Sequence, residues 1–410
     1  MTINIFIILI FLLSIVFTFK YKFIQLKFIS KSKESLSNKT SYTAFLLSLG
    51  SHIGAGNILG VTTALIIGGP GSLFWMIVCT IFTSIFSLME NTIALKYTTT
   101  IDNERRGGSP YYILYGLKNK KLAIVFSFML VLSSTVFFLP IQVKGVSFSL
   151  SELFNINNYY IICLLLIFSS LCIFRGTNIL TKIINKIVPL MTVVFLTISI
   201  YALFVKIEMV PSVLKLILKD AFNIKSGSIG MIIVGLKRSL FSNEAGLGTA
   251  PSINCYSDNK PIKQGYLQVL TCFIDTVVMC VLLGVVILLY GVNINDYNGE
   301  ELSIIIFENI FPGKGLYIGS FIIFTFSLAT IISSYYAGET NMLFNNVICK
   351  KDTNILKTCY KMLFILGLFL GVFMENTGIW NLIDYGLVFL GMINIVIIIK
   401  LKNDFENELQ

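Results

Sequence analysis

A few charged and hydrogen-bonding residues stand inside otherwise apolar stretches of this sequence. Lys144, Arg238, Glu244 and Asp275 each interrupt a long hydrophobic run, and His52 is the only histidine. A single histidine leaves no second one from which to build a triad or a histidine-based metal cluster, so we do not expect an enzyme. Ionisable residues at membrane depth are instead candidates for binding, ion coupling or gating.

Two glycine-rich clusters lie in the middle of apolar segments, where a continuous helix gains nothing from them. The first covers residues 50–60 and includes Asn57, and the second covers residues 238–248. Unwound backbone at membrane depth is tolerated only where it lines a cavity or is buried in protein, so both clusters predict discontinuous helices that face a central site. A half-helix N-terminus suits a carboxylate and freed carbonyls suit sodium, which predicts symport of an anionic-headed solute with a cation.

The elements that position these residues must be membrane helices. Of 410 residues 55% are hydrophobic and only 13% are charged, too little polar surface for a soluble protein of this size. The chain is therefore expected to be an all-α integral membrane protein, and its net charge of +10 need not imply a nucleic-acid partner. About eleven apolar segments are expected to span the membrane: 3–19, 43–68, 72–97, 122–150, 159–174, 183–207, 228–250, 264–291, 314–345, 358–375 and 378–399.

The basic residues predict the orientation of these segments. The first run, 3–19, has no basic region before it and no cleavage site after it, so it is expected to be a retained helix. If every segment crosses the membrane, most Lys and Arg residues fall in the connections of one side, which should be cytoplasmic. We therefore expect the N-terminus outside and the C-terminus in the cytoplasm. The Lys-, Ile- and Asn-rich composition favours a bacterial plasma membrane.

The positions of the two clusters divide the chain into repeats. Each cluster opens a block of five segments, and because five is odd, the second block must be inverted relative to the first. Inverted repeats with interrupted helices in corresponding positions are typical of secondary transporters. The expected units are an extra N-terminal helix with a basic connection (1–42), a first repeat (43–207), an external connection (208–227), a second repeat (228–400) and a cytoplasmic tail (401–410).

Specific strings resemble the alanine or glycine:cation symporter family, also called the sodium:alanine symporters. They are Gly54-Ala55-Gly56-Asn57-Ile58-Leu59-Gly60-Val61, Gly68-Gly69-Pro70-Gly71-Ser72-Leu73-Phe74-Trp75-Met76 and Phe241-Ser242-Asn243-Glu244-Ala245-Gly246-Leu247-Gly248. The resemblance extends over nearly the whole chain. It implies a LeuT-type fold of five plus five inverted helices, sodium as the co-transported ion, a small neutral amino acid as substrate and no other cofactor. We expect a monomer.

The resemblance also implies residues for the site. Sodium would lie between the carbonyls of Gly50 and Ile53 and the hydroxyls of Ser327 and Thr330. The amino acid would be bound by residues of both breaks and by side chains of two further segments: Gly54, Gly56, Asn57, Phe241, Ser242, Asn243, Gln142 and Thr330.

Two residues depart from the family pattern. Ser334 stands where the family commonly has Trp, which predicts a roomier substrate pocket that accepts amino acids larger than alanine. Lys144 stands where the family usually has Asn. Its amine could replace a cation or take up a proton, giving a proton-coupled or sodium-independent transporter, or it could extend toward the outer face.

The remaining ionisable residues have two interpretations each. His52 could lie near the substrate carboxylate or in a proton path, or it could pack between helices. Glu244 could accept bonds from the unwound amides or pair with Arg238, and Asp275, like Glu90, could tie helices together or contact a gate. A channel and a non-transporting member of the family are the other classes that we consider.

Overall fold

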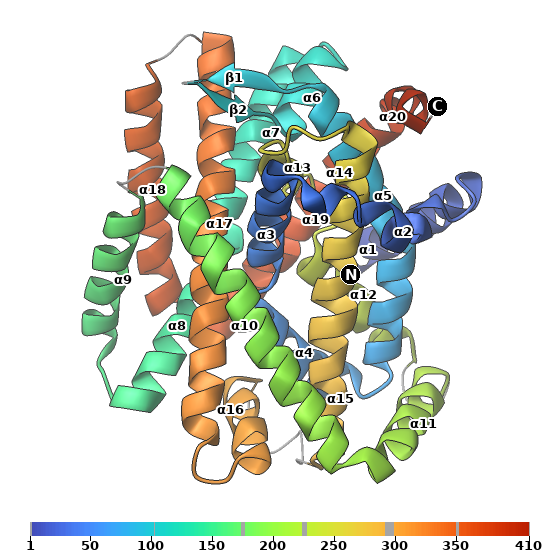
Figure 1. Ribbon diagram of the computed structural model, residues 1–410, viewed down its shortest axis with the longest axis vertical. Helices are drawn as coiled ribbons and strands as arrows, with labels where there is room; N and C mark the ends of the chain where they lie inside the picture. The colour runs from blue at the N-terminus through green and yellow to red at the C-terminus, as the bar shows by residue number, and fades with distance from the viewer. Residues whose placement is uncertain are drawn as a thin grey trace.

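The computed structural model describes residues 2–101, 103–173, 177–223, 228–291, 299–349 and 352–409, and they form an almost entirely helical bundle (Figure 1). The helices of the first half are α1 Thr2–Lys20, α2 Phe28–Ser32, α3 Lys39–His52, α4 Ala55–Gly68, α5 Ser72–Lys96, α6 Ser109–Tyr115, α7 Lys120–Leu132, α8 Leu139–Phe154, α9 Asn158–Ile173 and α10 Thr177–Val205. Those of the second half are α11 Val210–Ala221, α12 Ser228–Asn243, α13 Pro251–Asn254, α14 Pro261–Cys272, α15 Leu282–Leu289, α16 Gly299–Ile310, α17 Gly315–Cys349, α18 Thr353–Phe373, α19 Asn376–Lys400 and α20 Lys402–Leu409.

Short elements complete the described part of the chain. Two π-helical stretches follow α7 and α14. The first, η3 Ser133–Phe137, leads to α8 through a bend at Phe138, and the second, η6 Phe273–Val281, continues directly into α15. Three single 3₁₀ turns cover Ile24–Lys27, Ser35–Ser37 and Ile207–Met209. One antiparallel hairpin pairs β1 Thr99–Ile101 with β2 Glu104–Arg106.

Eight helices in the described part of the chain are long and apolar enough to cross a membrane, and α3 with α4 forms a ninth if the bent pair is one span. Every predicted segment contains a helix. The predicted spans 159–174 and 228–250 correspond to α9 and α12, which are 16 residues each and shorter than the other spans. The chain is thus a multi-pass membrane protein.

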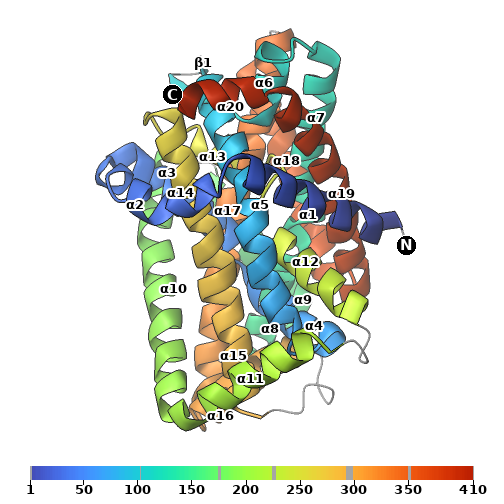
Figure 2. The ribbon, with the colours of Figure 1, turned by 90° about the vertical axis from the view of Figure 1, so that its right-hand side faces the viewer.

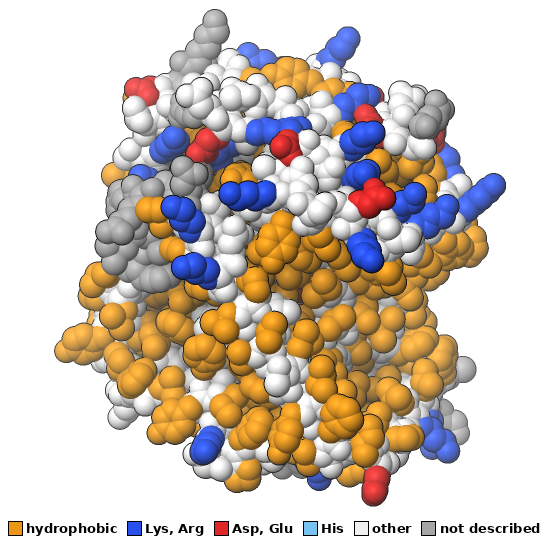
Figure 3. Space-filling model, viewed as in Figure 1, with side chains coloured by type: hydrophobic (Ala, Val, Ile, Leu, Met, Phe, Trp, Pro, Cys, Tyr) orange, Lys and Arg blue, Asp and Glu red, His pale blue; other side chains and the backbone are white. Residues whose placement is uncertain are grey.

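The surface separates into an apolar belt and one basic end. Hydrophobic side chains cover the middle of the face in Figure 3, while Lys and Arg side chains gather toward the end that carries α2, the β1–β2 hairpin, α6 and α20. This end is called the basic end below. Large apolar residues are exposed along the belt, for example Ile167, Phe204 and Phe373, as expected of side chains that face lipid.

The N-terminal helix α1 lies across the bundle. Figure 2 shows it at a large angle to α10 and α14, against α5 and α19. Its end is held by α20, because Glu406 accepts hydrogen bonds from Lys20 Nζ at 2.7 Å and from the Tyr21 hydroxyl at 2.9 Å. The length and composition of α1 suit a span, but its direction differs from that of the other long helices, so the outside location of the N-terminus stays a prediction.

Two segments that we expected to be a connection and a tail contain helices. The connection 208–227 includes α11, whose Val213, Ile217 and Ala221 are buried at every fourth position and anchor it to the bundle. Residues 224–227 of this connection lie outside the described residues. The tail 401–410 forms α20, whose Asp404 accepts a hydrogen bond from Lys96 Nζ at 2.6 Å.

Candidate functional site

The first predicted break lies between α3 and α4, which meet at 43°. Ile53 and Gly54 are extended there, so the helix ends at His52 and restarts at Ala55. The freed Ala55 N–H donates to Gln142 Oε1 of α8 at 2.8 Å. A Cβ placed on Gly54 would overlap Gln142 Oε1 and lie 2.6 Å from Thr330 Oγ1, so any larger residue would displace these two side chains.

The second predicted break follows α12, where residues 244–250 are not helical before α13 begins. Gly246 and Gly248 have φ of 82° and 80°, the left-handed region that favours glycine. Their N–H groups donate to the two carboxylate oxygens of Glu90 at 3.2 and 3.0 Å, and Asn394 Nδ2 donates to the same carboxylate at 2.8 Å. Glu90 is fully buried in α5, so it fixes the path of the unwound segment.

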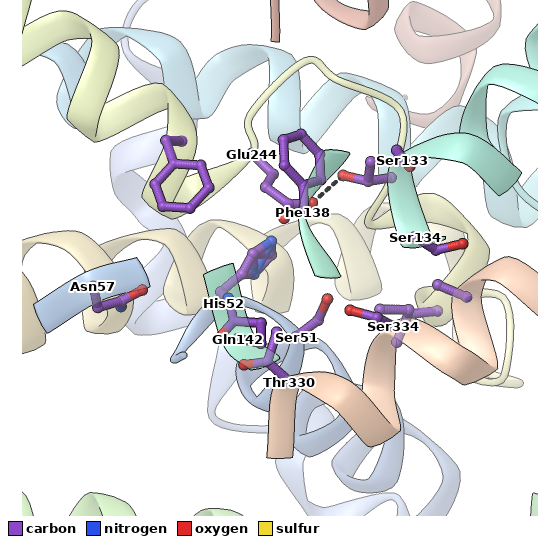
Figure 4. Close-up of a pocket in the computed structure, with 14 residues that line it drawn as sticks. Ser51, His52, Asn57, Ser133, Ser134, Phe138, Gln142, Glu244, Thr330 and Ser334 are labelled. Carbon is purple, nitrogen blue, oxygen red and sulfur yellow. Dashed lines mark hydrogen bonds between the residues drawn. The ribbon is translucent and has the colours of Figure 1, made fainter. Parts of the chain in front are cut away.

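Both breaks lie beside one cavity, which extends over η3, α8 and α17 (Figure 4). Figures 1 and 2 show α3–α4 leading away from the basic end and α12–α13 leading toward it, so the two broken helices are antiparallel. The cavity is nearly closed, with about 30 Å³ of free space between its lining side chains. Its lining residues are Ser51, His52, Asn57, Ser133, Ser134, Phe138, Gln142, Phe241, Glu244, Thr249, Ile253, Thr330, Ser334 and Ala337.

Seven of the residues singled out in the sequence line this cavity: His52, Asn57, Gln142, Phe241, Glu244, Thr330 and Ser334. Gly54 lies directly behind the Gln142 and Thr330 side chains, and a Cβ on Gly56 would lie 2.6 Å from the Phe241 ring. Asn243 points away from the cavity, because its amide donates to Ser239 at 3.1 Å.

Asp275 joins the two breaks from η6. It is fully buried and accepts hydrogen bonds from Asn57 Nδ2 of α4 and Ser242 Oγ of α12, with Thr276 Oγ1 at 3.3 Å. No Lys or Arg of the described residues forms an ion pair with it. Asp275 therefore connects these helices through one carboxylate whose hydrogen-bond donors are all neutral side chains.

Three of the four oxygen atoms expected to bind sodium lie close together. Thr330 Oγ1 lies 2.9 Å from the Gly50 carbonyl oxygen and 3.1 Å from that of Ile53. The Ser327 hydroxyl donates to the backbone of its own helix at 2.7 Å. Ser333 was not singled out in the sequence. Its buried hydroxyl has no partner in the part of the chain that the structure describes, and it lies 3.0 Å from where a Cβ of Gly50 would be. In the sequence, its position one helical turn after Thr330 is the feature that could have indicated its place beside the sodium site.

An aromatic cluster covers the cavity on the side away from the basic end. The Arg238 guanidinium carbon lies 3.7 Å from the centre of the Trp380 ring, which contacts Phe241, and Phe241 in turn contacts Phe138. Arg238 therefore stacks on Trp380, whereas the Glu244 carboxylate accepts a hydrogen bond from Thr249 Oγ1. The unwound amides that Glu244 was expected to bind are bound by Glu90.

Toward the basic end, a buried arginine joins the β1–β2 hairpin to α17. Arg106 of β2 donates to Thr340 Oγ1 of α17 at 2.6 Å and pairs with Glu104 at 2.5 Å and Glu339 at 3.5 Å. Only 2% of its surface is exposed. The hairpin is thereby fastened to α17 at the basic end. Lys144, by contrast, is half-buried on α8 and does not line the cavity.

A multi-pass helical bundle with two antiparallel broken helices around a central polar cavity is the architecture of a secondary membrane transporter. The match to the sodium:alanine symporter family covers residues 1–410, so the chain belongs to this family of transporters and is not an enzyme. It is 29% identical to the amino-acid carrier protein AlsT of Bacillus subtilis, over 95% of this chain and 85% of that protein. It is 30% identical to the sodium/alanine symporter AgcS of Methanococcus maripaludis, over 84% of this chain and 77% of that protein.

A solved structure supports the fold. The crystal structure of MhsT in complex with L-phenylalanine matches with a TM-score of 0.62 at 16% identity, covering 87% of each chain. At this identity the likeness shows the fold alone. It agrees with the predicted LeuT-type architecture.

Proposed function

We propose that the protein is a sodium-coupled symporter that carries a small neutral amino acid into the cell by alternating access. The observation that carries this proposal is the meeting of both helix breaks at one cavity. A half-helix N-terminus and a half-helix C-terminus there present opposite partial charges, which complement the carboxylate and the ammonium of a zwitterion.

The α-carboxylate of the substrate is expected at the N-terminus of α4. The Ala55 N–H donates to a side-chain oxygen there, Gln142 Oε1 at 2.8 Å. A carboxylate oxygen of the substrate can take the place of Gln142 Oε1 as the acceptor. An anionic oxygen there gains from the helix dipole. The ammonium is expected at the end of α12, beside the half-buried carboxylate of Glu244.

Sodium is proposed to bind where the Gly50 and Ile53 carbonyls surround Thr330 Oγ1. A hydroxyl has one hydrogen and cannot donate to both carbonyls at once, so a cation satisfies this group of oxygens better than the hydroxyl does. Ser327 and Ser333 are the neighbouring hydroxyls that could complete the coordination. Lys144 lies outside the cavity lining, so its position gives no support to a replacement of the cation.

The proposed orientation follows the basic end. Lys and Arg residues concentrate on cytoplasmic connections, so the end with α2, the β1–β2 hairpin and α20 is placed in the cytoplasm of a bacterial cell. The C-terminus is then cytoplasmic, and the aromatic cluster of Phe138, Phe241 and Trp380 covers the cavity on the outside.

The test is uptake of labelled alanine and glycine by liposomes that contain the purified protein, under an imposed sodium or proton gradient. Thr330→Val is expected to raise the sodium concentration for half-maximal uptake about tenfold or more, because it removes an oxygen ligand. The control is Thr325→Val, also on α17, whose hydroxyl bonds only the backbone of its own helix. No uptake under either gradient contradicts transport, and uptake driven by protons without sodium contradicts sodium coupling.

A further inference from the structure

The cavity has more polar groups than a zwitterion alone requires. In Figure 4, Ser134 and Ser334 lie on the side of the cavity opposite Asn57, with His52 and Ser51 between them. These side chains come from η3, α17 and α3, not from the ends of α4 and α12 that are assigned to the carboxylate and the ammonium. They therefore form the wall that a substrate side chain would meet.

His52 is the strongest of these observations. It is 4% exposed, it lines the cavity, and neither ring nitrogen has a hydrogen-bond partner among the described residues. A neutral imidazole offers one N–H donor and one nitrogen acceptor. A buried polar group without a partner is costly, so two unpaired nitrogens at a cavity wall indicate that a ligand or water must satisfy both.

The serines of this wall add complementary groups. Ser133 Oγ and Ser134 Oγ already donate to backbone carbonyls at 2.7 and 2.9 Å, so toward the cavity they can only accept. Ser334 is 8% exposed and lines the same wall. A side chain in this place would thus meet both donors and acceptors.

We propose that this wall recognises a neutral side chain with both a donor and an acceptor, a carboxamide fitting best, and that His52 and Ser334 determine this specificity. The inference rests on the proposed amino-acid transport and names its substrate class. The carboxamide oxygen accepts from the imidazole N–H or the Ser334 hydroxyl, and its NH₂ group donates to the other imidazole nitrogen or to Ser134. An acidic side chain would meet the Glu244 carboxylate at the same cavity, and an apolar one would leave His52 unpaired.

The test is competition in the liposome assay. Sodium-driven uptake of labelled L-alanine is measured against unlabelled L-alanine, L-glutamine, L-asparagine, L-leucine and L-glutamate. Glutamine or asparagine is expected to inhibit at concentrations about tenfold or more below those of alanine, leucine and glutamate. Stabilisation of the detergent-purified protein against heat by the same amino acids gives a binding readout that does not depend on transport.

Three variants test whether the residues of this wall cause the preference for a carboxamide. Ser334→Ala and His52→Phe are expected to reduce the advantage of glutamine over alanine to less than about threefold, because each removes a hydrogen-bonding group from the wall. Ser320→Ala is the matched control. Its hydroxyl is buried on α17 without a partner among the described residues, but it does not line the cavity, so the ratio should be unchanged.

The outcomes separate the two proposals. Uptake of alanine with no advantage for a carboxamide, or an advantage that survives both Ser334→Ala and His52→Phe, overturns the inference and leaves the transport proposal standing. If no amino acid is taken up and none stabilises the protein, the proposed function fails and the inference fails with it.

Discussion

The buried carboxylate of Glu90 gives the sharpest test of how the second break is held. All of its partners are donors: the Gly246 and Gly248 N–H groups and the Asn394 amide. A Glu90→Gln substitution keeps the shape of the side chain but turns one acceptor oxygen into an NH₂ group that must face a donor. The perturbation is therefore confined to hydrogen bonding at the unwound segment.

The expected loss follows from those contacts. Removing one hydrogen bond to a charged group costs about 1.5–3 kcal/mol, and leaving a buried N–H unpaired costs about 1–3 kcal/mol. We expect a loss of unfolding free energy of about 3–5 kcal/mol, in the range for breaking a buried charged contact. The measurement is an SDS titration in mixed micelles followed by the fluorescence of the two tryptophans, Trp75 and Trp380.

Glu308→Gln is the matched control, because the Glu308 carboxylate also binds two backbone N–H groups, those of Gly313 and Leu316, but at the exposed start of α17. Water can replace these bonds, so the expected loss is about 1 kcal/mol or less. Equal losses for the two variants would refute the argument that burial of the carboxylate holds the break.

Three further predictions concern the site and the basic end. Gly54→Ala should reduce uptake about tenfold or more, because its Cβ would displace the Gln142 and Thr330 side chains from the cavity wall, whereas Gly230→Ala, with nothing within 4 Å, should retain it; equal uptake by both would contradict the close packing. Ser334→Trp should fill the cavity and favour glycine and alanine over larger amino acids in competition assays, and an unchanged order of preference would speak against Ser334 as a pocket wall. Hydrogen bonding to Lys20 lowers the pKa of Glu406, so its stabilisation of α20 is present above the unfolded pKa and is lost as pH falls through the folded value. The rate of proteolysis at the C-terminus should increase in that acidic range, because α20 loses less than about 1 kcal/mol of stabilisation. Glu406→Gln should make this rate independent of pH over the same range.

The two helix breaks could be predicted because glycine spacing is a local signal. Gly54 and Gly246 stand where only glycine fits the close approach or the backbone conformation, and the sequence around them is otherwise apolar. The cavity lining by Asn57, Gln142 and Thr330 was implied by resemblance to a family, not by periodicity.

Contacts between distant helices could not be predicted in the same way. The partners of Glu90, and the unpaired hydroxyl of Ser333 beside Gly50, depend on how α5, α12 and α17 pack. The direction of α1 was equally hidden, because an apolar run of sufficient length does not encode a tilt. The helices α11 and α20 were missed because the sequence was read for spans.

The π-helical stretch η3 has a consequence for how this site could change in evolution. Its i→i+5 bond, from Phe138 N–H to the Ser133 carbonyl at 3.0 Å, accommodates one residue more than a regular helix would. Deleting a single residue there would remove the extra residue of the π-helical stretch, while Phe138 and Pro140 would still bend the chain where α8 begins. The hydroxyls of Ser133 and Ser134 would leave the cavity. A change in chain length of one residue would thus alter the polar groups that line the cavity while the surrounding helices keep their positions.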